Sequence, residues 1–146
     1  MRKRLLPVIM LLCLVSAACT NQPSNKTVEL RPPEPTFTVD GKELSYNIGT
    51  YSWNDEGQAV NVDTAKPPHL VENMENEVAS NAQLEIRFEN APSQMKGGIW
   101  KENTVDMVPL KRHKVSLPKK SDDFIYVLQA SWEEGDAIYV IPFKTK

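Results

Sequence analysis

The chain has 146 residues, enough for one domain, with 17 basic and 19 acidic residues and a formal net charge of −2. Removal of residues 1–18, argued for below, leaves 14 basic residues against 19 acidic ones, a formal charge of −5. A mildly acidic domain of this kind is not expected to bind nucleic acid, nor an anionic membrane by bulk charge.

Residues 1–18 have the features of a secretory signal peptide. Arg2, Lys3 and Arg4 form a basic start, and residues 5–18 then run without a charge. That run is too short to cross a hydrocarbon layer of roughly 30 Å, which needs about 20 helical residues. The sequence therefore predicts a segment that directs export and is then removed.

The residues before Cys19 resemble a bacterial lipobox, in which small residues precede a cysteine that is lipidated and becomes the mature N-terminus. Here the run reads Val15-Ser16-Ala17-Ala18-Cys19, with a serine where leucine is the commoner residue. An ordinary secretory cleavage site at the same small residues is the alternative. The other cysteine, Cys13, lies in the segment to be removed, so lipidation accounts for the one cysteine that is left. We expect a lipid anchor on Cys19 at the extracytoplasmic face of the cell membrane.

Residues 19–35 are predicted to comprise the lipidated cysteine and a tether. The stretch 20–35 is polar, lacks aromatic residues and contains four prolines. Such a composition cannot bury enough apolar surface to fold by itself. We expect it to link the anchor to a folded domain over residues 36–146.

Within that domain, apolar residues alternate with polar ones, which is typical of strands with one buried face. The clearest strand runs through Leu84, Ile86 and Phe88, with charged residues between them. A second strong pattern predicts a C-terminal hairpin of residues 124–132 and 137–143.

Turn and breaker residues refine this pattern. Asp40-Gly41 suits a tight hairpin turn, and Gly49, where the alternation changes parity, suits a β-bulge. Residues 67–81 are predicted as a loop with a short strand near Val78. Because Pro142 has no N–H to donate to a ladder, we expect the last strand to lie at an edge or to end there.

About seven to nine short strands, separated by turns and without a firm helix, predict an all-β fold. We predict an immunoglobulin-like antiparallel β-sandwich over residues 36–146, with a small β-barrel as the alternative. Because the mature domain has no cysteine pair, its core alone must stabilise it.

Two motifs carry a resemblance to known proteins. Residues 49–53 read Gly-Thr-Tyr-Ser-Trp, and residues 130–139 read Ala-Ser-Trp-Glu-Glu-Gly-Asp-Ala-Ile-Tyr. They resemble a group of small uncharacterised lipoproteins of Gram-positive bacteria, which show a Gly-Thr-Tyr-x-Trp stretch and finish on a Trp-x-x-Gly-x-Ala-x-Tyr hairpin. The resemblance covers most of the chain from Val39 to Phe143. It implies the same cellular address and fold, and it brings no settled activity.

The candidate binding residues are Trp53, Trp100 and Trp132. Aromatic faces stack on sugars or anchor protein partners, whereas a tryptophan on a sandwich strand more often lies in the core. Trp53 and Trp132 each follow a serine and precede an acidic turn that contains glycine. This internal echo indicates either two similar hairpins or a duplicated site at one end of the sandwich.

Catalytic and metal chemistry find little support in the sequence. His69 and His113 lie in polar stretches outside any recognised motif, so a nucleophile activated by histidine is not predicted. Two scattered histidines do not make a structural zinc site, and the acidic turns at 54–56 and 133–136 are of a kind that is usually just solvated. We predict no enzyme, no cofactor and no metal.

The predicted function is a non-catalytic binding module of the cell envelope. Its expected partners are the membrane, through the lipid, and an unknown envelope protein or polymer. The alternative is an inhibitor of an extracellular protease or lytic enzyme, for which residues 93–98 would have to form an exposed, ordered loop.

Overall fold

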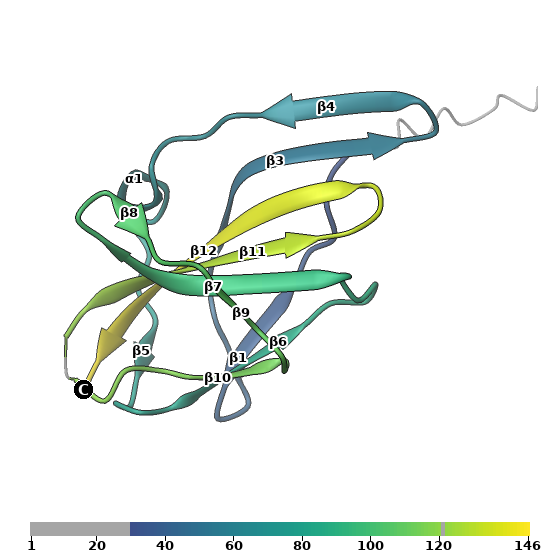
Figure 1. Cartoon of the computed structure of the whole chain (residues 1–146). Helices are drawn as coiled ribbons and strands as arrows, with labels where there is room; N and C mark the ends of the chain where they lie inside the picture. The colour runs from purple at the N-terminus through teal and green to yellow at the C-terminus, as the bar shows by residue number, and fades with distance from the viewer. Residues whose placement is uncertain (1–29, 121) are drawn as a thin grey trace, which may run out of the picture.

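The computed structural model describes residues 30–120 and 122–146 (Figure 1). The predicted signal peptide, Cys19 and the tether up to residue 29 lie outside the described residues. Among the residues described, no helix is both long and apolar enough to cross a membrane. In chain order the elements are β1 (Thr36–Val39), β2 (Lys42–Glu43), β3 (Asn47–Asp55), β4 (Gln58–Val62), α1 (Pro67–Leu70), β5 (Glu77–Val78), β6 (Gln83–Arg87), β7 (Gln94–Lys101), β8 (Thr104–Val105), β9 (Val108–Pro109), β10 (Lys114–Ser116), β11 (Phe124–Ser131) and β12 (Gly135–Thr145).

Two largely antiparallel sheets make up the described part of the domain. The small sheet has the strand order β10-β6-β1-β2. The large sheet, which is curled, has the order β4-β3-β12-β11-β7-β8, with β9 beside β7 and β5 beside β12 (Figure 1). The prediction of an all-β sandwich is confirmed. Its connectivity is not the immunoglobulin order, because the last strand lies in the middle of its sheet and not at an edge.

The core consists of the side chains that the alternating pattern turns inward. Leu84 and Ile86 of β6 are fully buried, as predicted, and share the core with Leu128 of β11 and Ile141 of β12. Fully burying one side chain of this size contributes about 1.5–3 kcal/mol. The contact between the two sheets is therefore the main stabilising feature of the described domain.

The predicted hairpin at Asp40-Gly41 is confirmed. Asp40 and Gly41 have φ values of 51° and 76°, and the strands pair directly on either side of them. Glu56 and Gly57 have φ values of 48° and 79° and join β3 to β4 in the same way. Two residues with positive φ match the twist of the flanking strands, which is why both hairpins are tight.

The predicted bulge at Gly49 is also confirmed. Tyr139 of β12 pairs with Ile48, whereas Ala137 pairs with Tyr51, so β3 carries one residue more than β12 between the two pairs. The extra residue returns Tyr51 to the core side of the sheet. A bulge therefore explains the change of parity in the sequence.

Residues 67–81 contain the single turn of α1 and the two-residue strand β5, so the predicted loop with a strand near Val78 is confirmed. The segment also supplies Asn76, which is 7% exposed. Its Oδ1 accepts from the Ser45 N–H at 2.9 Å, and its Nδ2 donates to the carbonyls of Ser45 at 2.7 Å and Pro142 at 2.9 Å. Asn76 thus ties the chain that crosses from β2 to β3 onto the last strand.

The prediction that Pro142 ends the last strand or places it at an edge is wrong. β12 continues to Thr145 and has neighbours on both sides for most of its length. Beside Pro142 there is a gap, because pairing with β3 ends at Val140 and pairing with β5 begins at Lys144. The carbonyl of Pro142 points into this gap, toward Asn76. The ring nitrogen of the same residue points the same way, so no ladder hydrogen bond is lost.

The inhibitor alternative would need an exposed loop at residues 93–98, and the structure has a strand there instead. Residues 94–98 belong to β7, where Met95 and Gly97 are buried. A Cβ atom at position 97 would overlap the ring of Tyr126 on the neighbouring strand β11. The glycine here makes room for an aromatic side chain and does not form a turn, so the loop expected of an inhibitor is not found at this position.

The last residues of the predicted tether, 30–35, lie against the domain. Pro32 and Pro35 are buried, and the Tyr139 hydroxyl donates a hydrogen bond of 2.6 Å to the carbonyl of Pro33. Proline favours an extended backbone that needs no internal hydrogen bonds. This described part of the tether therefore belongs to the folded unit.

Candidate functional site

Trp53 and Trp132 meet at one end of the large sheet. Trp53 lies near the end of β3, and Trp132 directly follows β11. The strands bring them together because Gly135, at the start of β12, pairs with Trp53. The ring centroids are 5.5 Å apart with an interplanar angle of 70°. The internal echo in the sequence therefore corresponds to two hairpin ends that are in contact.

The backbone beneath these rings is closely bonded. The Asn54 N–H donates to the Glu134 carbonyl at 2.8 Å, and the Trp132 N–H donates to the Gly135 carbonyl at 2.7 Å. A Cβ atom at position 135 would overlap the carbonyl oxygen of Ser52. Gly135 thus permits a close approach of β12 to β3, and this approach fixes the distance between the two hairpin ends.

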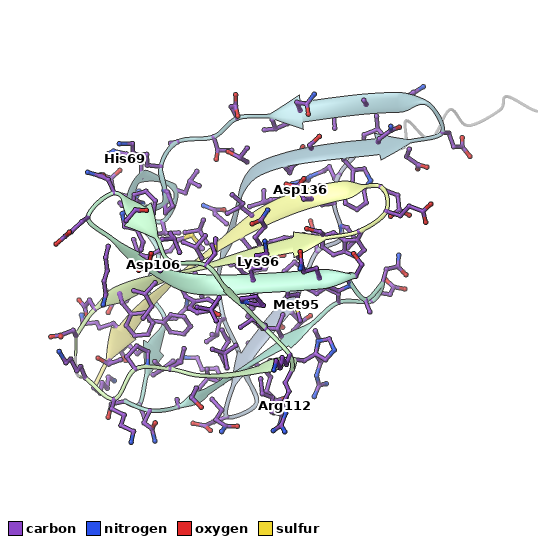
Figure 2. The ribbon with its side chains drawn as sticks, viewed as in Figure 1. His69, Met95, Lys96, Asp106, Arg112 and Asp136 are labelled. Atoms are coloured by element: carbon purple, nitrogen blue, oxygen red, sulfur yellow. The ribbon has the colours of Figure 1, made fainter. Side chains whose placement is uncertain are left out.

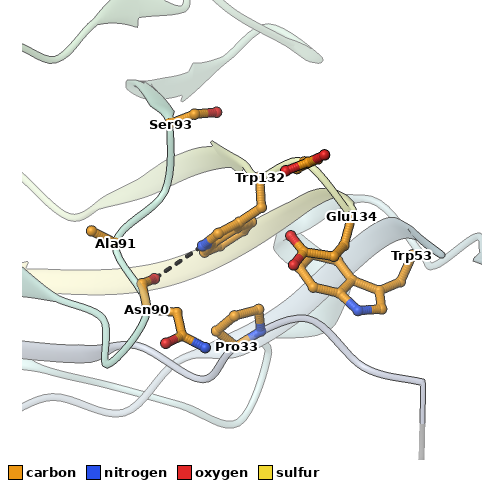
Figure 3. A pocket seen from close by; sticks show the side chains of 8 residues that line it. Pro33, Trp53, Asn90, Ala91, Ser93, Trp132 and Glu134 are labelled. Carbon is orange, nitrogen blue, oxygen red and sulfur yellow. Dashed lines mark hydrogen bonds between the residues drawn. The ribbon is translucent and has the colours of Figure 1, made fainter. Parts of the chain in front are cut away.

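The ring of Trp132 is held on its other side by the segment after β6. Its Nε1–H donates to the Asn90 carbonyl at 2.9 Å (Figure 3). Phe88 meets the same ring edge to face, with centroids 5.1 Å apart. The same segment is fixed to β11, because Ser93 donates to the Ser131 carbonyl from both its N–H and its hydroxyl. Because the indole N–H is already paired, the ring has only its π surface and apolar edge left for a ligand.

The three candidate tryptophans do not form one platform. Trp53 is 8% exposed and lies in the core, whereas Trp132 is half-buried. Trp100 is half-buried at the opposite end of β7, where it pairs with Val105. The structure therefore brings Trp53 and Trp132 together and leaves Trp100 apart.

Two adjoining hollows lie beside the tryptophan pair. The first, which we call the indole hollow, has a volume of about 320 Å³ and is lined by Pro33, Trp53, Asn90, Ala91, Ser93, Trp132, Glu133 and Glu134. The second, which we call the acidic hollow, has a volume of about 410 Å³ and is lined by Arg31, Pro33, Glu34, Trp53, Asp55, Glu89, Asn90 and Glu134. Figure 3 shows Pro33, Trp53 and Glu134 around the indole of Trp132. The shared residues make the two hollows one continuous depression.

Carboxylates predominate on the rim of this depression. Among the described residues that line the two hollows, five are acidic and one, Arg31, is basic. Arg31 has an interaction of its own with the rest of the protein. Within residues 30–120 and 122–146, no three His, Cys, Asp or Glu side chains gather closely enough to hold a metal ion. The acidic groups are thus distributed around the rim and do not converge on one point.

The two histidines lie apart from this depression and from each other. His69 is on α1, and His113 directly precedes β10. Figure 2 shows His69 and Arg112, the chain neighbour of His113, on opposite sides of the molecule. The hydroxyl of Ser93, which lines the indole hollow, already donates to a backbone carbonyl. The structure therefore does not pair either histidine with the hydroxyl of Ser93.

Sequence reasoning missed the residues that complete the site. Arg31, Pro33 and Glu34 were assigned to the tether, and Asn90 lies in a segment without periodicity. A signal was present for the first three, because a run of prolines directly before a strand favours an extended segment that can cover a sheet. The sequence could not identify Asn90, because it contacts Trp132 through its backbone carbonyl, which every residue type has.

The chain was compared with known protein families, curated proteins and solved structures. No protein-family model and no curated protein matches the chain, and no solved structure matches it either.

Proposed function

We propose that this protein is a lipoprotein anchored to the membrane at its extracytoplasmic face, and that its sheet domain is a non-catalytic binding module of the cell envelope. The observation that carries the second part is the depression beside Trp53 and Trp132. Half-exposed tryptophan on a preformed, hydrogen-bonded backbone is a common anchor for a ligand, because little side-chain freedom is lost on binding. Concave sites with aromatic walls and a few polar groups are typical binding sites.

The place where the chain enters the domain supports a role close to the membrane. Arg31 and Pro33 line the depression, so residue 30 enters the domain beside it. Between Cys19 and residue 30 there are ten residues, a length of chain that can reach at most about 40 Å. On this proposal the binding surface is held near the lipid headgroups, and lipid chains on Cys19 supply the attachment.

The anchoring is tested by Cys19→Ala. We expect the variant to lose lipid labelling and to stay as a precursor or to leave the cell. Cys13→Ala is the matched control, because it removes the other cysteine from the predicted signal peptide and should label like the parent. Equal labelling of the Cys19 variant and the parent would contradict the proposed anchor.

The binding module is tested by capture from solubilised envelope fractions with the lipidated protein as bait. We expect one component to be retained saturably by the parent and by Trp100→Ala, and to be lost with Trp132→Ala. Trp100 is the matched control because it is also half-buried but lies at the far end of β7. Retention that is the same for all three baits would contradict binding at the depression.

A further inference from the structure

We infer that the depression binds an organic cation, an alkylammonium or guanidinium group, between its tryptophan wall and its carboxylate rim. This inference rests on the proposed binding function and specifies the chemistry of the ligand. The first argument for it is the cavity itself. The two hollows together are larger than a small amine needs, and two indoles, one of them half-exposed, form the wall of the first.

The second argument is what the tryptophan wall can offer. The indole N–H of Trp132 donates to the Asn90 carbonyl and is not available to a ligand. The face of an indole carries negative electrostatic potential, and it attracts ammonium and guanidinium groups that come within about 6 Å of the ring centroid. The indole of Trp132 therefore offers no hydrogen-bond donor to an anionic or neutral ligand.

The third argument is the charge around the wall. The acidic side chains on the rim are contributed by four separate segments of the chain: Glu34, Asp55, Glu89, and the adjacent pair Glu133 and Glu134. Among the described lining residues the opposite charge is that of Arg31, a residue that has an interaction of its own. Negatively charged carboxylates around a concave surface raise the local concentration of cations.

The distribution of the carboxylates favours an organic cation over a metal ion. A bound calcium ion needs six to eight oxygens within about 2.6 Å. The described acidic residues on the rim do not gather in threes. An alkylammonium or guanidinium group is satisfied by an aromatic face and one or two carboxylates at longer range.

The test uses the full-length chain in a neutral maltoside detergent, with 5-fluorotryptophan in place of tryptophan and ¹⁹F NMR as the readout. The three tryptophans give three signals, each assigned by a Trp→Phe variant. Choline is the cationic probe, and 3,3-dimethylbutan-1-ol is its neutral counterpart of the same shape. We expect choline to shift the Trp132 and Trp53 signals saturably and to leave Trp100 in place, and the alcohol to bind about 10-fold more weakly.

The contribution of the rim is tested by Glu134→Gln, because Glu134 lines both hollows. We expect this variant to bind choline about 2- to 5-fold more weakly than the parent does. Added salt should also lower the affinity of the parent for choline. Glu102→Gln is the control. It changes the net charge equally but lies in the turn at the far end of β7. The affinities for ethylammonium and for N-acetyl-lysine amide are then compared. The first probe represents a free small amine, and the second represents a lysine side chain of a protein partner.

The inference is overturned if the alcohol binds as tightly as choline, or if Glu134→Gln and Glu102→Gln bind choline equally. It is also overturned if choline shifts neither Trp53 nor Trp132. These outcomes leave the proposed function intact as long as capture of an envelope component still depends on Trp132. Loss of that dependence, in turn, contradicts the binding module whatever choline does.

Discussion

The domain contains two aromatic clusters built in the same way but with different exposure. In the closed cluster, Phe37, Tyr46 and Tyr139 meet edge to face, with centroids between 5.1 and 6.4 Å apart. In the open cluster, Trp53 and Phe88 meet Trp132 edge to face at 5.5 and 5.1 Å. Phe88 and Tyr139 join the two clusters at 5.6 Å.

The difference between the clusters is what covers them. Phe37 and Tyr139 are 0% and 1% exposed, and Tyr46 is half-buried. Phe37 is on the inward face of β1 in the small sheet, and the proline segment 31–35 lies against Tyr139. Burial raises the pKa of the Tyr139 hydroxyl well above its ordinary value, and that hydroxyl donates to Pro33. In the open cluster Trp53 is 8% exposed, and the half-buried Trp132 lines a hollow together with Pro33. Aromatic packing alone therefore does not distinguish a buried cluster from one that lines a hollow.

The largest difference in stability is expected when one ring is removed from each cluster. Phe37→Ala should lower the free energy of unfolding by about 3–5 kcal/mol, because it leaves a cavity in place of a fully buried side chain. Trp132→Ala should cost clearly less, because half-exposed atoms lose less burial and water can fill the space. Urea unfolding of both variants measures the difference, and equal losses would show that both clusters are core.

The next largest effect is expected from Gly135→Ala. The added methyl group forces β12 away from β3 beside Trp53, which should cost about 1–3 kcal/mol and change the tryptophan fluorescence. Gly57→Asn is the control in the neighbouring turn, since no atom lies within 4 Å of a Cβ there and asparagine tolerates positive φ. An unchanged emission spectrum in the Gly135 variant would mean that the close approach of β12 to β3 does not determine the arrangement of the two tryptophans.

A smaller effect is expected from Tyr139→Phe, which removes the hydrogen bond to Pro33 and leaves the ring in place. The loss should be about 1 kcal/mol. The amide chemical shifts of Arg31 and Glu34 should change, while those of the amides that pair β11 with β12 stay the same. Unchanged shifts in the proline segment would indicate that ring packing, and not the hydroxyl, holds this segment against the domain.

The smallest effect concerns the outer face of the small sheet, which covers the closed cluster. Lys114 Nζ lies 2.6 Å from Glu85 Oε1, and this hydrogen bond lowers the pKa of Glu85 below its ordinary value of 4.5. Because the carboxyl is more acidic in the folded state, the pair stabilises the fold above about pH 4.5 and this contribution is lost as the pH falls. Glu85→Gln should therefore be slightly less stable than the parent at pH 7 and equal to it near pH 3. A difference that does not change with pH would contradict this linkage.

Local patterns were predictable because they depend on neighbours in the chain. Alternation identified the inward face of β6, and residues that tolerate positive φ identified the hairpin at Asp40-Gly41. The bulge at Gly49 followed from the change of parity. In each case, the property that defines the element is contained in a few consecutive residues.

The sequence by itself thus determined the all-β class, the main strands and their tight turns, and it marked Trp53 and Trp132 as related positions. Only the tertiary structure decided that β12 is a central strand, that residues 94–98 form a strand with Met95 and Gly97 buried, and that the proline segment lies against Tyr139 and also borders the hollow beside Trp132. The physical reason is that strand order and cover depend on contacts between residues far apart in the chain. Asn76 and Ser45 illustrate this: no local pattern in either segment shows that their hydrogen bonds fix where the chain crosses between the sheets.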